Sequence, residues 1–260
     1  MLTPDDLLER TQWDTFWIPD DVTVVDRPEL RYLRCERDIP MLNTVVRTRG
    51  AAADLPGKVA EVAAAHQGVR SRWLVRDLDL RPALEKALAA AGYRPSFPTR
   101  AYTIGVDAHQ APAKAACTVW RVARLRELED AIRVSEQAFE APSHTTAAER
   151  RAYLTACRHE SGRVHRFVAY DDQTGLPLST GGMTHYPELC FCLLWAGSTV
   201  VEARGRGAYR AVLAARIDKA RALRATRVGL YAHVETSAPI VARLGFERHG
   251  PMTFWDLPPS

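Results

Sequence analysis

The sequence feature that most constrains the fold is a short arginine- and glycine-rich segment, Arg204 to Tyr209. An apolar, β-type run over 189–196 precedes it, and an amphipathic helical pattern over 210–224 follows it. Gly205 and Gly207 lack the Cβ atoms that would keep a bulky anion away from the backbone, so free N–H groups of the first helical turn can converge on phosphate oxygens. The partial positive charge at a helix N-terminus strengthens that attraction. The order of strand, glycine loop and helix therefore predicts a phosphate or pyrophosphate site.

Length and composition describe a globular protein. A chain of 260 residues is long enough for one large domain or two of average size, and its 47% hydrophobic residues can form ample core. The start of the chain, Met1 to Asp6, lacks the features of a signal peptide, and no apolar run has membrane-spanning length. We therefore expect a cytoplasmic protein with no membrane partner. The net charge of +4 is modest and the basic residues are spread along the chain, so no nucleic-acid partner is expected either.

The five cysteines do not form a recognisable metal or disulfide pattern. They have neither the CxxC spacing nor the neighbouring histidines of a zinc site, and their number is odd. We predict no metal and no disulfide. Cys190 and Cys192 stand two residues apart in a predicted strand, so both are expected on one face, filling core.

The hydrophobic pattern predicts an alternation of strands and helices along the whole chain. Strands are expected at 22–25, 43–47, 72–76, 101–106, 118–123, 164–170, 178–186, 189–196, 227–234 and 252–257, and helices at 7–17, 55–66, 82–91, 126–139, 145–159, 210–224 and 237–244.

Two polar residues stand out within these helices. Thr145, with Glu149 behind it, predicts a capped start for the helix at 145–159. Arg216 falls inside the apolar stripe of the helix at 210–224. An unpaired buried guanidinium is costly, so Arg216 must pair with a carboxylate or with backbone carbonyls, or reach outward. We expect a structural ion pair rather than a ligand contact.

The chain contains a weak internal repeat. Gly92-Tyr93 and Gly245-Phe246 each follow a predicted helix and precede a predicted strand, 153 positions apart. We therefore predict a first domain over 1–107, a linker over 108–117 and a second domain over 118–260. In the first half, a segment with one glycine and Asp54 stands where the second half has its glycine loop. Since that aspartate would repel phosphate, only the second half is expected to bind an anion.

These motifs resemble those of a known family. Arg204 to Ala208 matches the Q/R-x-x-G-x-G/A loop of the GCN5-related N-acetyltransferases (GNAT), and Leu244-Gly245-Phe246 matches the motif that ends their following helix. Residues 118–260 resemble one GNAT domain, and the whole chain resembles tandem members with a degenerate N-terminal half. The resemblance implies an α/β (α+β) fold of two GNAT-like domains, each a mixed, mostly antiparallel twisted sheet flanked by helices. It also implies acetyl-CoA as co-substrate.

The resemblance further assigns roles to residues of the second half. The loop is expected to hold the pyrophosphate of acetyl-CoA, although Tyr209 stands where the family has a small residue. A bulged strand end is expected to pair with the pantetheine arm and polarise the thioester carbonyl, and Ser237, next to Thr236, is expected near the thiol. The implied cofactor-binding residues are Thr199, Val200, Val201, Arg204, Gly205, Arg206, Gly207, Ala208, Tyr209 and Ser237.

The chemistry of acetyl transfer requires a base, because a primary amine with a pKa near 10 is mostly protonated at neutral pH. His233 and Glu235 are the candidate catalytic residues, just past the strand at 227–234; a structural role for His233 stays open. The departing thiolate needs an acid, but Val241 stands where many family members have a tyrosine. As second choices for the base we name three residues that precede the strand at 189–196, namely His185, Tyr186 and Glu188.

The sequence therefore predicts an N-acetyltransferase that moves an acetyl group to an amine of a small molecule or peptide by direct attack. The alternative is a non-catalytic acyl-CoA-binding or partner-binding module. A nucleotide-binding loop is disfavoured because no Lys-Ser/Thr pair follows the glycines. The sequence is compatible with an oligomer.

Overall fold

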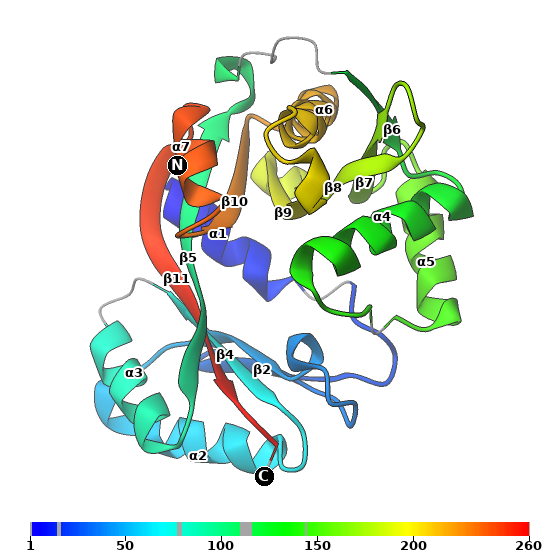
Figure 1. Ribbon diagram of the computed structural model, residues 1–260. Helices are drawn as coiled ribbons and strands as arrows, with labels where there is room; N and C mark the ends of the chain where they lie inside the picture. Colours follow the sequence, from blue (N-terminus) through cyan, green and yellow to red (C-terminus); the bar gives the residue numbers. More distant parts are fainter. Residues whose placement is uncertain (1, 15–16, 77–79, 110–115, 144, 260) are drawn as a thin grey trace. The chain divides into compact units, whose positions relative to one another are not determined.

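The computed structural model describes residues 2–14, 17–76, 80–109, 116–143 and 145–259 (Figure 1). The chain divides into two compact units. The first contains residues 1–102, 231–243 and 248–260, and the second contains residues 103–230 and 244–247. These units differ from the predicted boundaries, 1–107 and 118–260, because most of the C-terminal segment groups with the N-terminal residues. Of the predicted linker, 108–117, residues 110–115 lie outside the described residues.

The first unit has sheet order β1-β2-β3-β4-β11-β5. Helices α2 and α3 pack on a core that includes the fully buried Trp73, whose indole N–H donates to Thr48 Oγ1 at 2.9 Å. Its elements are α1 (Pro4–Trp13), β1 (Thr23–Arg27), β2 (Leu30–Arg34), β3 (Thr44–Thr48), α2 (Leu55–Ala65), β4 (Ser71–Arg76), α3 (Arg81–Ala90), most of β5 (Arg94–Gly105), α7 (Ala238–Arg243) and most of β11 (Glu247–Leu257).

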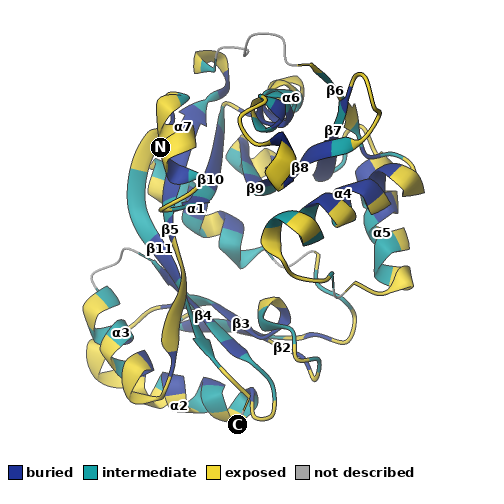
Figure 2. Ribbon diagram, viewed as in Figure 1, coloured by how far each residue is buried: buried dark blue, intermediate teal, exposed yellow. Residues whose placement is uncertain are grey.

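The second unit has sheet order β10-β9-β8-β7-β6. Strand β8 is buried over nearly its whole length (Figure 2), because α4 and α6 both pack against it. Its elements are β6 (Cys117–Arg121), α4 (Leu125–Phe139), α5 (Ala147–Arg158), β7 (Val164–Asp171), β8 (Pro177–Tyr186), β9 (Phe191–Thr199), α6 (Ala208–Ala222) and the first part of β10 (Arg227–His233). No helix of the described chain is both long and apolar enough to cross a membrane.

The strand directions agree with the predicted fold class. The pairs β3–β4 and β9–β10 are parallel, while β1–β2, β2–β3, β4–β11, β6–β7, β7–β8 and β8–β9 are antiparallel. Each unit is therefore a mixed, mostly antiparallel sheet with helices packed on it, and the predicted α/β (α+β) class is confirmed.

The internal repeat is visible in the local structure. Helices α3 and α7 both end at a glycine in the left-handed region, Gly92 with φ 88° and Gly245 with φ 84°. That conformation favours glycine because it has no Cβ. The aromatic residue that follows each glycine is buried, Tyr93 to 2% exposure and Phe246 to 5%. In each half, one pair of strands joined by a helix is parallel, β3–α2–β4 and β9–α6–β10.

Four sequence predictions of local structure were wrong. The pattern missed strand β2. Helix α5 is capped by Thr146, whose Oγ1 accepts from the Glu149 N–H at 3.1 Å, and not by Thr145. The first helix ends at Trp13 instead of residue 17, because Asp14 has extended backbone, and Trp17 is exposed. Of the two cysteines expected to share a buried strand face, Cys192 is buried in β9, but Cys190 precedes the strand, has φ 47° and is exposed.

Candidate functional site

The loop between β9 and α6 leaves the first turn of α6 accessible to a ligand. Gly205 has φ 79°, and Gly207, the N-cap residue of α6, has φ 88°. Among the residues that the structure describes, no side chain caps the first turn of α6, so its backbone N–H groups lack both an intrahelical acceptor and a side-chain acceptor. A Cβ on Gly205 would meet no atom within 4 Å, so the space around this glycine is open. This arrangement offers donors and room to an anion.

The two arginines of the loop have different partners. Arg206 Nη2 lies 2.6 Å from Asp171 Oδ2 at the end of β7, so this arginine ties the loop to the sheet. Arg204 is exposed, and its side chain makes no hydrogen bond or ion pair with any residue that the structure describes. Of the two guanidinium groups, that of Arg204 is therefore the one available to a ligand.

Asp171 is a residue that the sequence reasoning missed. Its Oδ1 accepts from the N–H groups of Thr174 and Gln173, each at 3.0 Å, and these bonds, with the Arg206 guanidinium, hold the pKa of the carboxyl below its usual range. The residues that follow Asp171 are typical of a turn, so its bonds to Gln173 and Thr174 had a local signal in the sequence. Nothing in the sequence linked Asp171 to Arg206, 35 positions later.

A β-bulge lies in β9 just before the loop. Gly182 pairs with Trp195 and Thr180 with Ser198, so Gly181 alone opposes both Ala196 and Gly197. Ala196 has φ 47°, the left-handed conformation that one type of bulge places at its first residue. The parallel pairing of β9 with β10 ends at Leu194, one residue before Trp195. Backbone groups of β9 are thus freed from the ladder at the bulge.

The predicted position of this bulge, Thr199 to Val201, was wrong by three residues. Thr199 ends β9, and its Oγ1 lies 3.0 Å from Ser179 Oγ. The Val200 N–H donates to the Leu178 carbonyl at 3.0 Å, so it is already used within the sheet. Val201 is exposed and begins the short 3-10 turn Val201–Ala203. The bulge at Ala196 therefore replaces these residues as the place where β9 leaves backbone groups unpaired.

Arg216 on α6 does not form the ion pair expected from its sequence position. Its side chain is 1% exposed, and none of the ion pairs among the described residues involves it. Its Nε lies 3.4 Å from the Val212 carbonyl and its Nη1 lies 3.3 Å from the Gly182 carbonyl, both as donors. Backbone carbonyls thus take the place of the carboxylate that the sequence led us to expect.

Gly182 leaves room for the Trp195 indole, which gives a testable prediction. A Cβ on Gly182 would lie 2.2 Å from Trp195 Cη2, and the indole is held by its N–H donation to Thr184 Oγ1 at 3.0 Å. We expect Gly182→Ala to lower the free energy of unfolding by about 3 kcal/mol, measured by urea denaturation. As a control, Gly57→Ala in α2, where a Cβ meets no atom within 4 Å, should raise it by about 0.5–1 kcal/mol. Equal stabilities of the two variants would contradict this close packing.

The predicted catalytic residues and Ser237 belong to the first compact unit, whereas the loop belongs to the second. His233 ends β10 and is half-buried, with its ring 5.0 Å from that of Phe97. Its Nδ1 lies 3.4 Å from the backbone N of Glu235, whose side chain is exposed. Ser237 precedes α7, and its carbonyl accepts from the N–H groups of Ile240 and Val241.

The second-choice bases are less suited to proton transfer. His185 is buried in β8, and burial lowers the pKa of its imidazole. Tyr186 is also buried, and the Arg163 guanidinium lies 5.2 Å from its ring centroid. Val241 is fully buried and fills core at the position where many GNAT proteins have the tyrosine that protonates the thiolate.

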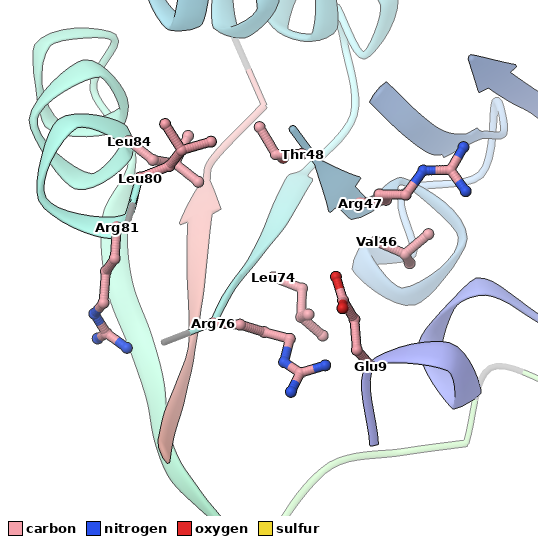
Figure 3. A pocket seen from close by; sticks show the side chains of 9 residues that line it. All are labelled: Glu9, Val46, Arg47, Thr48, Leu74, Arg76, Leu80, Arg81 and Leu84. Atoms are coloured by element: carbon pink, nitrogen blue, oxygen red, sulfur yellow. The ribbon is translucent and has the colours of Figure 1, made fainter. Parts of the chain in front are cut away.

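The corresponding loop of the first half has different chemistry. Lys58 Nζ donates to the Arg49 carbonyl at 2.9 Å and lies 3.9 Å from Asp54 Oδ2. The aspartate thus remains at the start of α2, where it disfavours an anion. A cavity in the same unit, of about 20 Å³, is large enough for a water molecule but not for a ligand (Figure 3). It is lined by Glu9, Val46, Arg47, Thr48, Leu74, Arg76, Leu80, Arg81 and Leu84. Among the described residues, no cluster of His, Cys, Asp or Glu could hold a metal ion.

Comparison with known proteins identifies the fold. No protein-family model matches the sequence, and no curated protein matches it. A GCN5-related N-acetyltransferase from Kribbella flavida matches with a TM-score of 0.66 and 16% identity, over 92% of this chain and 91% of that one. A GCN5-related N-acetyltransferase from Sphaerobacter thermophilus gives 0.62 and 16%, over 90% and 82%.

A third match bears on the repeat. A tandem GNAT protein from the clavulanic acid biosynthesis pathway matches with a TM-score of 0.56 and 19% identity, over 92% of this chain and 84% of that one. The chain has the GNAT fold. The predicted resemblance, tandem GNAT architecture included, is thus supported at the level of fold.

Proposed function

We propose that this GNAT-fold protein is an N-acetyltransferase that moves an acetyl group from acetyl-CoA to an amine of a small molecule or peptide. The observation that carries the proposal is the uncapped start of α6, with two left-handed glycines and the unpaired Arg204 beside it. Convergent N–H donors, a helix dipole and a free guanidinium suit a pyrophosphate better than a monoanion. We place the enzyme in the cytoplasm.

The residues present fit acetyl-CoA in a consistent way. Arg204 to Tyr209 would hold the pyrophosphate, because Gly205 has open space and the first turn of α6 has unused donors. The bulge at Ala196 would supply backbone groups for the pantetheine arm and the thioester carbonyl, since β9 is unpaired with β10 from there. Acetyl-CoA supplies the activated acyl group when it is bound.

The protein's own part in the reaction is proton transfer and charge stabilisation. His233 or Glu235 would take the proton from the ammonium form of the acceptor before attack, because both side chains reach solvent and the amine is mostly protonated at neutral pH. The acid that protonates the departing thiolate is not Val241, so water is the proposed donor.

The proposal is tested by thiol release from acetyl-CoA with a panel of primary amines. We expect at least one amine to raise the rate of thiol release well above that of hydrolysis. His233→Asn and Glu235→Gln are measured side by side. The variant that removes the base should lower the rate by about 100-fold, and the other variant, which keeps the base, is its matched control.

The second candidate function is a non-catalytic acyl-CoA-binding or partner-binding module. The observation that favours it is the complete burial of Val241, which leaves no acid at that position. Saturable binding of acetyl-CoA without thiol release, for every amine in the panel, would support this module and contradict the enzyme.

A further inference from the structure

The guanidinium of Arg216 is a buried charge that the described protein leaves uncompensated. Its hydrogen-bond acceptors are the carbonyls of Val212 and Gly182, and its Nη2 has no hydrogen-bond partner among the described residues. Burial lowers the pKa of Arg216, but an arginine keeps its proton throughout the physiological range. A single cation in a low-dielectric interior is costly, so its retention requires a reason.

The charge lies directly against the bulge. A Cβ on Gly181 would come 2.8 Å from Arg216 Cζ, and a Cβ on Gly197 would come 3.3 Å from Nη2. Only glycine at these two positions lets the guanidinium approach the backbone of β8 and β9 so closely. Because these two residues are glycines, no side-chain atom at either position separates the charge from the residues around Ala196.

The same charge also reaches the start of α6. Tyr209, in the first turn, lies beside the Arg216 side chain, since a Cβ on Gly197 would meet both of them within 3.4 Å. The Tyr209 ring packs under the bulge as well, since its Cε2 would lie 3.1 Å from a Cβ on Gly197. Arg216 and Tyr209 thus join the two places proposed to contact acetyl-CoA, and all of these residues belong to the second compact unit.

We propose that Arg216 is a positioning residue whose buried charge is compensated by the anionic groups of a bound acyl-CoA. This inference rests on the proposed function. Because the local dielectric constant is low, the charge acts strongly on a ligand at the bulge and at the start of α6. It should therefore destabilise the ligand-free protein and favour the ligand-bound one.

The test compares Arg216→Met, Arg216→Lys and Arg204→Ala with the unmodified chain. CoA affinity is measured by calorimetry at about 0.05 and 0.5 M salt, and thermal unfolding is measured without ligand. We expect Arg216→Met to weaken CoA binding about tenfold at both salt concentrations, because a buried charge is little screened. Arg204→Ala should weaken it mainly at low salt, because Arg204 is exposed.

Two further readouts separate an electrostatic role from a structural one. Arg216→Met should raise the melting temperature of the ligand-free protein by about 2–4 °C, because it removes an uncompensated charge. Arg216→Lys, which keeps the charge, should retain most of the CoA affinity.

A lower melting temperature of Arg216→Met with unchanged CoA affinity would overturn the proposal, because Arg216 would then be structural only. Equal loss of affinity in Arg216→Lys and Arg216→Met would also overturn it. If the unmodified chain does not bind CoA, the proposed function fails. In that case the ligand-free melting temperatures still test whether the Arg216 charge is uncompensated. A lower melting temperature of Arg216→Met would show that the protein itself compensates the charge.

Discussion

Deletion of residues 247–260 is expected to unfold the compact unit that contains residues 1–102. The deleted segment includes β11 (Glu247–Leu257), which pairs antiparallel with β4 from Met252 opposite Arg76 to Leu257 opposite Ser71. Trp255 and Leu257 also pack against the core around Trp73. Both side chains are half-buried, and Met252 of the same strand is fully buried. Removing one fully buried side chain of this size costs about 2–5 kcal/mol, so losing all three with the strand approaches the total stability of a domain, about 5–15 kcal/mol.

Amide hydrogen exchange measures this effect directly. In the deletion variant, the amides of β4 and α2 should lose most of their protection. A matched variant that lacks only 258–260 keeps every paired residue of β11 and should exchange like the full chain. Full protection of β4 in the longer deletion would show that the N-terminal residues fold without β11.

The features that the sequence predicted well are local ones. Gly92 and Gly245 were identified because a left-handed helix end is determined by a few neighbouring residues. Helix α6 and its glycine loop were identified for the same reason, since two glycines before an apolar stripe leave few alternatives. Strand β2 was missed because its five residues, Leu30 to Arg34, do not alternate strictly between apolar and charged side chains, and the run is too short for periodicity to decide.

The features that it did not predict depend on contacts between distant residues. The pairing of β11 with β4 joins residues about 180 positions apart, and no local pattern specifies it. For that reason the compact units differ from the predicted boundaries. The link from Arg206 to Asp171 is of the same kind.

The surroundings of Arg216 were also beyond the sequence. Its place in an apolar stripe indicated burial, and the structure confirms burial. Its partner could not be deduced, because the space for the guanidinium comes from glycines on β8 and β9. The bulge was placed too late for a related reason: it is set by the register of β9 on β8, which the sequence of β9 alone does not reveal.

The loop before α6 is the proposed pyrophosphate site, and a double substitution tests that assignment. Arg204→Ala removes the unpaired guanidinium, and Gly207→Asp places a carboxylate beside the N–H groups of the first turn, where it repels a pyrophosphate and competes for its donors. One charge-assisted hydrogen bond contributes about 1.5–3 kcal/mol, so the combined loss of affinity should be about 100-fold or more.

The decisive measurement is a calorimetric titration of acetyl-CoA into the unmodified chain and into Arg204→Ala/Gly207→Asp. Arg49→Ala, in the corresponding loop of the first half, serves as the control because it removes an arginine of that loop whose Nη2 lies 3.3 Å from Glu9 Oε1. We expect saturable binding to the unmodified chain and to the control, and no measurable binding to the double variant. Unchanged affinity in the double variant would contradict the assignment of this loop as the pyrophosphate site.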